Sequence, residues 1–169
     1  IFTLLGPLTN PAGADVQVIG VYDPALTEPL AHVLGELGSR AAFVIHGAGG
    51  TDELNTSGSN RVSHLKDGAV RTFDLDPATL GFAPSAISEL RGGSADDNAV
   101  VMRSLLAGQV NGARRSAVVL NAAAAIAAES GDLPAAVAEA EQALDSGAAL
   151  AKLEALVAYS QSFAPKEQG

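Results

Sequence analysis

Two short apolar runs near the start of the chain flank a segment of helical periodicity. Residues 16–22 and 41–46 are rich in β-branched and other apolar residues without clean alternation, which is typical of strands buried on both faces. Between them, Asp23 and Pro24 supply an N-cap and a first helical proline. The apolar residues at helical spacing after this cap are Leu30, Val33, Leu34 and Leu37. A strand-helix-strand unit of this kind is almost always parallel and right-handed.

The pattern then changes to a hairpin followed by helices. Residues 61–65 and 69–73 flank Asp67-Gly68, a favoured two-residue hairpin turn. Residues 116–128 are apolar on most helical faces, so this helix should be central and buried. A last helix carries an apolar stripe of Leu150, Leu153, Leu156 and Val157.

These elements predict an α/β fold in which a mostly parallel sheet is flanked by helices and carries a short antiparallel hairpin. No internal repeat or linker divides the chain, so residues 1–163 are predicted to form one unit, with a frayed tail at 164–169. The chain opens on an apolar stretch without Met, and we expect it to be part of a longer protein.

The strongest candidate for chemistry follows the second predicted strand. His46 is followed by a turn with three glycines and then by two adjacent carboxylates, Asp52 and Glu53. Ligands of open parallel sheets bind beyond the carboxyl ends of the strands, where this turn should lie. Carboxylate oxygens suit Mg²⁺, which is shared between a few acids, waters and substrate phosphates. The alternative is a plain turn with solvated charges, and His46 itself is more simply a hydrogen-bonded strand end than a substrate contact.

Other candidates have simpler structural explanations beside the functional ones. The loop that contains Gly6 and Pro7 is either a rigid connection or a ligand-facing loop. Arg91 precedes two glycines and a helix start that Ser94 should cap, a pattern that also suits an anion site. Arg114 begins the buried helix and either holds an anion or is a solvated charge.

Composition narrows the classes of partner. The net charge of −9 argues against non-specific nucleic-acid binding, which needs a basic surface. The sequence has no signal peptide pattern and no long charge-free apolar run, so no membrane partner is predicted. The lack of cysteine excludes disulfides and fits a cytoplasmic protein.

An ordered set of motifs across nearly the whole chain resembles the anthranilate phosphoribosyltransferase family. The segments that carry the resemblance are Leu4-Leu5-Gly6-Pro7-Leu8-Thr9-Asn10-Pro11, Gly20-Val21-Tyr22-Asp23-Pro24, His46-Gly47 with Asp52-Glu53, Arg91-Gly92-Gly93 with Asn98-Ala99, Leu120-Asn121-Ala122-Ala123 and Ser146-Gly147-Ala148-Ala149. Each segment is modest alone, but their order is specific.

The resemblance implies a fold, a reaction and site residues. The fold would be the C-terminal part of the large domain of a nucleoside-phosphorylase-like phosphoribosyltransferase, without the helical N-terminal region through which such proteins usually form homodimers. Anthranilate would attack phosphoribosyl pyrophosphate and release pyrophosphate, a step of tryptophan biosynthesis. By the same resemblance, Asp52 and Glu53 would bind Mg²⁺. Gly6 and Pro7 would line the anthranilate pocket.

The chain also departs from the family pattern. The family's glycine-rich phosphoribosyl pyrophosphate loop, its second metal contact and its anthranilate-facing arginine belong before Ile1, so we expect this chain alone to be inactive. Thr51 stands where an apolar residue commonly precedes the acidic pair. Two alternatives are a pyrimidine nucleoside phosphorylase of the same fold and a non-catalytic nucleic-acid-binding relative. The Gly6-Pro7 loop together with the acidic pair disfavours the first, and the charge balance disfavours the second.

Overall fold

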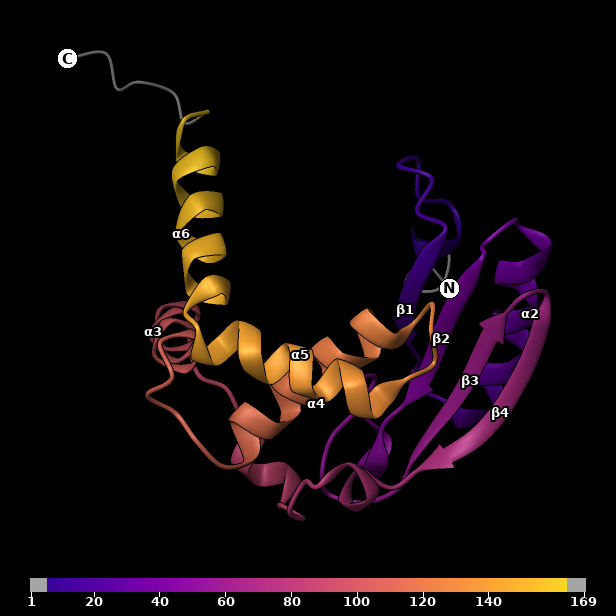
Figure 1. Cartoon of the computed structure of the whole chain (residues 1–169), viewed down its shortest axis with the longest axis horizontal. Helices are drawn as coiled ribbons and strands as arrows, with labels where there is room; N and C mark the ends of the chain where they lie inside the picture. The colour runs from indigo at the N-terminus through magenta and orange to yellow at the C-terminus, as the bar shows by residue number, and fades with distance from the viewer. Residues whose placement is uncertain (1–5, 164–169) are drawn as a thin grey trace.

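The computed structural model describes residues 6–163 as a four-stranded sheet with helices on both sides (Figure 1). The predicted tail at 164–169 lies outside these residues. The strands are β1 (Val16–Gly20), β2 (Ala41–His46), β3 (Asn60–Lys66) and β4 (Ala69–Leu75). The helices are α2 (Thr27–Glu36), α3 (Ala95–Leu106), α4 (Ala113–Ala127), α5 (Leu133–Asp145) and α6 (Ala148–Gln161).

The sheet is mixed, which corrects the prediction of a mostly parallel sheet. The strand order is β1-β2-β3-β4, with β1 and β2 parallel and the two remaining pairings antiparallel. A parallel return needs a long crossover, usually through a helix. The loop between β2 and β3 contains only the short turn Ala48–Gly50, so β3 comes back antiparallel beside β2.

The predicted hairpin is confirmed. β3 and β4 pair from Lys66 opposite Ala69 outward, and Asp67 and Gly68 form the turn with φ values of 50° and 76°. Both values lie in the left-handed region that this type of tight turn requires.

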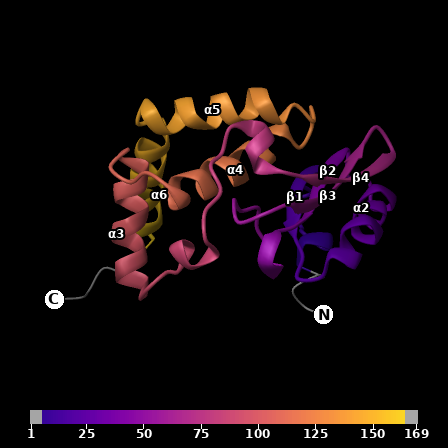
Figure 2. The same ribbon diagram turned by 90° about the horizontal axis from the view of Figure 1, so that it is seen from below.

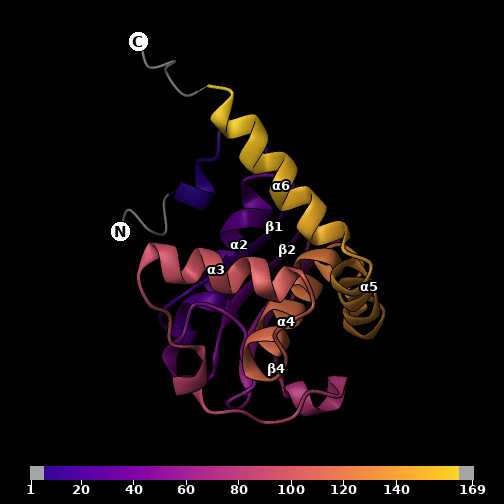
Figure 3. The same ribbon diagram turned by 90° about the vertical axis from the view of Figure 1, so that its left-hand side faces the viewer.

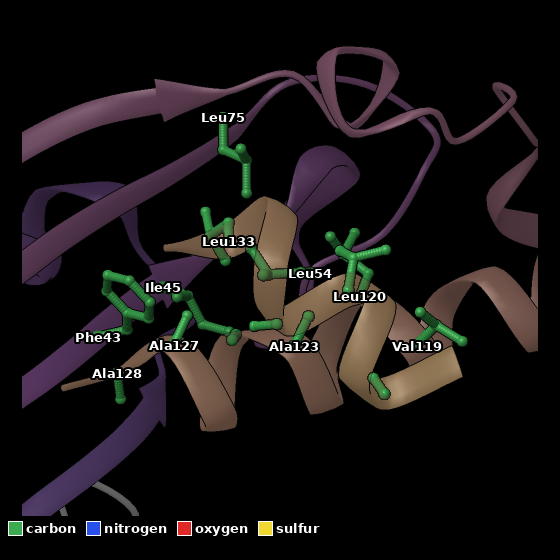
Figure 4. Packing of buried hydrophobic residues seen from close by; sticks show 14 of the residues in the cluster. Phe43, Ile45, Leu54, Leu75, Val119, Leu120, Ala123, Ala127, Ala128 and Leu133 are labelled. Atoms are coloured by element: carbon green, nitrogen blue, oxygen red, sulfur yellow. The ribbon is translucent and has the colours of Figure 1, made fainter. Parts of the chain in front are cut away.

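Strand β2 is the centre of the fold because both of its faces are buried. Ala42 and Val44 point into a small cluster with residues of α2 such as Leu34. Phe43 and Ile45 point the other way into a larger cluster with α4 and α5. Figure 2 shows α2 on one side of the sheet and α4 and α5 on the other, and Figure 4 shows the larger cluster from close by.

Helix α4 is buried on one side only, so its predicted burial is confirmed in part: Val118 and Ile126 are each 39% exposed. Its inward residues include Val119, Leu120 and Ala123, each almost fully buried. The small alanine side chains allow α4 to lie close to both the sheet and α5.

Two apolar stripes predicted from helical spacing are only partly buried. In α2, Leu30 and Leu34 face the sheet, whereas Val33 is 40% and Leu37 is 60% exposed. α6 extends away from the sheet and has no buried residue, although an Arg103–Glu154 ion pair links it to α3 (Figure 3). None of the helices in the described ranges combines the length and hydrophobicity of a membrane span.

His64 links β3 to the end of α4. Its Nε2–H donates to the Ala128 carbonyl at 2.9 Å, and its ring packs on Phe43 at a centroid distance of 4.3 Å. Burial lowers the pKa of His64 below its ordinary value, and nearby Lys66 acts in the same direction, whereas the hydrogen bond to Ala128 opposes them. His64 is therefore a neutral structural residue.

We predict that His64 makes stability depend on pH. Because the fold disfavours its protonated form, the unfolded chain binds more protons near the ordinary pKa of about 6.5. The free energy of unfolding should therefore rise with pH through this range and fall again on acidification. Urea unfolding at several pH values should show a smaller rise for His64→Gln than for the wild type. The exposed His32 provides the control, and an identical pH profile for His64→Gln and His32→Gln would contradict the assignment.

Gly20, the last residue of β1, permits a close approach of the loop after β2. A Cβ atom at Gly20 would overlap the backbone carbonyl oxygen of Asp52. The loop therefore lies directly on the carboxyl end of β1, and the fit depends on glycine at this position.

We predict that Gly20→Ala displaces this loop and destabilises the protein. The new methyl group meets backbone that cannot rotate away, so the free energy of unfolding should fall by about 1–3 kcal/mol. Gly35→Ala in α2 is the matched control, because its Cβ would lie 3.2 Å from a side-chain carbon of Leu65, which can shift, and alanine favours helix. Equal urea midpoints for Gly20→Ala and Gly35→Ala would refute the proposed fit.

Candidate functional site

The structure places Asp52 and Glu53 where the sequence predicted them, just beyond the carboxyl end of β2. The chain leaves His46 and turns back at Gly49 and Gly50, both with positive φ. Gly47 closes this turn by donating its N–H to the Thr51 carbonyl at 2.8 Å. Both carboxylate side chains that follow are exposed.

Polar side chains within the loop hold the backbone around the two acids. The Thr51 hydroxyl donates to the Glu53 carbonyl at 2.8 Å, and the Asn55 side-chain amide donates to the Thr51 hydroxyl at 2.8 Å. Buried Asn60 accepts from the backbone N–H groups of Ala48 and Asn55. The acids therefore project from a backbone whose polar groups are already satisfied on the inner side.

Glu53 lines three neighbouring pockets, two of which Asp52 also lines, and these pockets are together called the groove. One pocket of about 450 Å³ contains Asp52, Glu53 and Arg91, and one of about 390 Å³ contains both acids with Gly20 and Asn121. The third, about 460 Å³, is mostly apolar and lies between α3 and α4. The groove is large enough for a substrate of several chemical groups.

The two acids are free to bind a cation. Neither carboxylate forms an ion pair in the described part of the chain. Among residues 6–163 there is also no cluster of three or more metal-ligating side chains. Two unpaired carboxylates beside an open groove fit Mg²⁺, whose remaining ligands are usually water and phosphate oxygens.

Arginines border the same groove in two different roles. Arg91 lines two of the pockets, and no hydrogen bond or ion pair of its guanidinium is found within residues 6–163. Arg114 is instead structural, because it donates to the backbone carbonyls of Glu89 at 3.2 Å and Arg91 at 2.9 Å. Arg115 pairs with Asp145 at 2.7 Å. The solvated-charge interpretation of Arg114 is thus replaced by a backbone tie, and no anion is needed to explain it.

The helix start after Arg91 is a capping box, as predicted. The Ser94 hydroxyl accepts from the Asp97 N–H, while the Asp97 carboxylate accepts from the Ser94 N–H and hydroxyl. These hydrogen bonds lower the pKa of Asp97. Asn98 also bonds both backbone groups of Gly93, so the turn is held without a ligand.

His46 has the structural role that the sequence favoured. Its Nδ1 lies 2.9 Å from the Val21 carbonyl, which only an Nδ1–H donor can satisfy. This hydrogen bond joins the ends of β1 and β2 below the loop.

Gly6 and Pro7 lie apart from the acids. Pro7 lines a pocket of about 140 Å³ with residues at the start of β1 and the end of α2, among them Asp15 and Leu37. In Figure 1 this segment lies at the end of the sheet opposite the loop after β2. The described structure therefore does not bring Gly6 and Pro7 together with Asp52 and Glu53.

Sequence reasoning missed the residues that support the loop. Asn121 and Gly20 contact its backbone, but in the sequence they stand out only as parts of a family motif. A polar residue inside an alanine-rich buried helix was the available signal for Asn121, because buried amides need hydrogen-bond partners.

Comparison with known proteins gives consistent results. The chain is 50% identical over 165 residues to the anthranilate phosphoribosyltransferase of Moorella thermoacetica, which covers 96% of this chain and 48% of that protein. The enzyme of the same name from Desulfatibacillum aliphaticivorans is 50% identical over 163 residues, 95% of this chain and 48% of its own. The chain thus spans about half the length of these relatives. The resemblance inferred from the motifs is confirmed.

Solved structures agree with the sequence relatives. The anthranilate phosphoribosyltransferase of Thermus thermophilus superposes with a TM-score of 0.84 at 40% identity, covering 92% of this chain and 46% of that one. The Saccharomyces cerevisiae enzyme in complex with PRPP and Mg gives a TM-score of 0.76 at 26% identity, over 89% and 44%. The α/β fold prediction is confirmed, as a fragment of that larger fold.

A protein-family model also matches the chain. The model described as "Glycosyl transferase family, a/b domain" covers residues 1–150, most of the 169-residue chain. The chain therefore belongs to the glycosyl transferase family represented by this a/b domain.

Proposed function

We propose that the protein containing this chain transfers the phosphoribosyl group of phosphoribosyl pyrophosphate to anthranilate and releases pyrophosphate. The observation that carries the proposal is an exposed acidic pair on a tightly held loop, in a chain half identical to enzymes of that name. This chain would supply the α/β part of the catalyst. On this proposal the protein is a cytoplasmic enzyme of tryptophan biosynthesis, and the full-length form is a homodimer.

Asp52 and Glu53 are the proposed Mg²⁺ ligands. A structure of the yeast relative contains PRPP and Mg, and the two acids here are unpaired and face the groove. When bound, Mg²⁺ would neutralise the charge that builds on the departing pyrophosphate. The chain's own contribution is to hold the backbone that carries both carboxylates through the loop hydrogen bonds of Thr51 and Asn55.

The proposed nucleophile belongs to the substrate. Anthranilate carries an amine, so the reaction requires no covalent enzyme intermediate, and correct positioning can supply much of the rate. We also propose that Gly6 and Pro7 contact anthranilate. That part rests on the family resemblance alone, since Pro7 lines a different pocket from the acids.

The alternative functions have less support. A pyrimidine nucleoside phosphorylase is disfavoured because the relatives quoted above carry the name anthranilate phosphoribosyltransferase. Nucleic-acid binding is disfavoured by the net charge of −9 and by the two unpaired acids in the groove.

We predict that removing either acid charge impairs catalysis without impairing folding. In the full-length protein, Asp52→Asn or Glu53→Gln should lower kcat/KM for phosphoribosyl transfer by about 10- to 100-fold and raise the Mg²⁺ concentration needed for half-maximal rate. Both side chains are exposed, so urea midpoints should change little. The measurement is the initial rate across a Mg²⁺ titration.

The matched control is Asp67→Asn in the hairpin turn. It also removes one exposed negative charge, and asparagine tolerates the positive φ at this position. Asp67→Asn should keep wild-type rates. Wild-type rates and Mg²⁺ dependence in Asp52→Asn and Glu53→Gln would show that the acids are not the metal ligands.

A further inference from the structure

Asn121 is a polar residue on the otherwise apolar inner part of α4. Its neighbours Leu120, Ala123 and Ala124 are completely buried in the larger core cluster. A side-chain amide in such surroundings is costly unless its donors and acceptor are satisfied. Asn121 also lines the pocket that contains both Asp52 and Glu53.

The side-chain amide of Asn121 forms two hydrogen bonds with the backbone of Leu54 in the loop. Its Oδ1 accepts from the Leu54 N–H at 3.0 Å, and its Nδ2 donates to the Leu54 carbonyl at 2.7 Å. The second Nδ2 hydrogen donates to the Ala117 carbonyl one turn earlier at 2.9 Å, which fixes the side-chain orientation. Asn121 thus pairs with Leu54 much as a neighbouring strand would.

Leu54 directly follows Glu53 in the chain. Consecutive Cα atoms are about 3.8 Å apart, so fixing both backbone groups of Leu54 fixes the peptide that joins it to Glu53. Leu54 is also anchored by its side chain, which is 1% exposed in the core cluster (Figure 4). From the other side, Asp52 rests on Gly20 at the end of β1. The acidic pair is therefore seated between β1 and α4.

We propose that Asn121 is a positioning residue for the acidic pair, holding Asp52 and Glu53 in the arrangement that binds a divalent cation. This inference rests on the proposed function, because it takes the two acids as the cation ligands. We assign Asn121 to the backbone rather than to the cation, because its Oδ1 accepts from Leu54 and both Nδ2 hydrogens are donated, to Leu54 and Ala117. Loss of an outer partner of this kind typically weakens metal binding by about 10- to 100-fold.

The test is Mn²⁺ binding to the full-length protein in the presence of inorganic pyrophosphate, measured from the electron paramagnetic resonance signal of free Mn²⁺. The component lost in Asp52→Asn defines the site. Asn121→Leu keeps the branched shape of the side chain but removes every hydrogen bond of the amide, and it should weaken that component by at least about tenfold. Hydrogen exchange of the segment 51–55 should become faster in the same variant.

Ser63→Ala is the matched control. Ser63 is fully buried and bonded to the Thr72 hydroxyl at 2.8 Å, away from the loop, so its loss removes a partly buried hydrogen bond between two strands. It should leave Mn²⁺ affinity and exchange of 51–55 unchanged. If Asn121→Leu does not fold, the smaller change Asn121→Ser is measured in the same way and should show a weaker loss.

The outcomes separate the two proposals. Mn²⁺ affinity within about twofold of the wild type in a folded Asn121 variant, or an equal loss in Ser63→Ala, overturns the positioning role while the metal site stands. Wild-type Mn²⁺ affinity in Asp52→Asn overturns the metal site itself, and the positioning role with it.

Discussion

The close contact between the loop after β2 and the carboxyl end of β1 is the constraint on which the site depends. Because Gly20 has no side chain, the backbone of Asp52 can lie directly on the strand. The parallel pairing of β1 with β2 brings these two strand ends side by side, and the His46 hydrogen bond to Val21 keeps them together. The direction of the two acids is therefore a property of the sheet as much as of the loop.

The two hydrophobic clusters pack helices on opposite faces of the sheet. The smaller cluster joins α2 to the sheet and stabilises the strand-helix-strand unit. The larger cluster packs α4 and α5 against the opposite face of the sheet and includes Leu54 from the loop. Apolar burial, which is non-directional, thus brings α4 near the loop, and hydrogen bonds then determine how the loop sits.

Local features of this fold were predictable from the sequence, and long-range ones were not. The Asp67-Gly68 turn, the Ser94–Asp97 capping box and the exposed acids after β2 depend on residues close together in the chain. The extent of parallel pairing was predicted wrongly because the loop 47–59 contains no crossover helix, so β3 returns antiparallel to β2.

The residues that support the site could not be predicted from local sequence patterns. Asn121 bonds to a residue 67 positions earlier, and no local pattern joins the two. The separation of Gly6 and Pro7 from the acids is likewise a result of topology, since one segment precedes a strand and the other follows the next strand.

One helix sets the distance between the two walls of the groove. Arg114 ties the Glu89–Arg91 wall to α4, and Asn121, about two turns further along, ties the acid-bearing wall to the same helix. Both walls are thus tied to one helix, while the acid-bearing loop is also held on the end of β1. The separation of the two walls therefore depends on the length of α4 between Arg114 and Asn121 rather than on α3, α5 or α6.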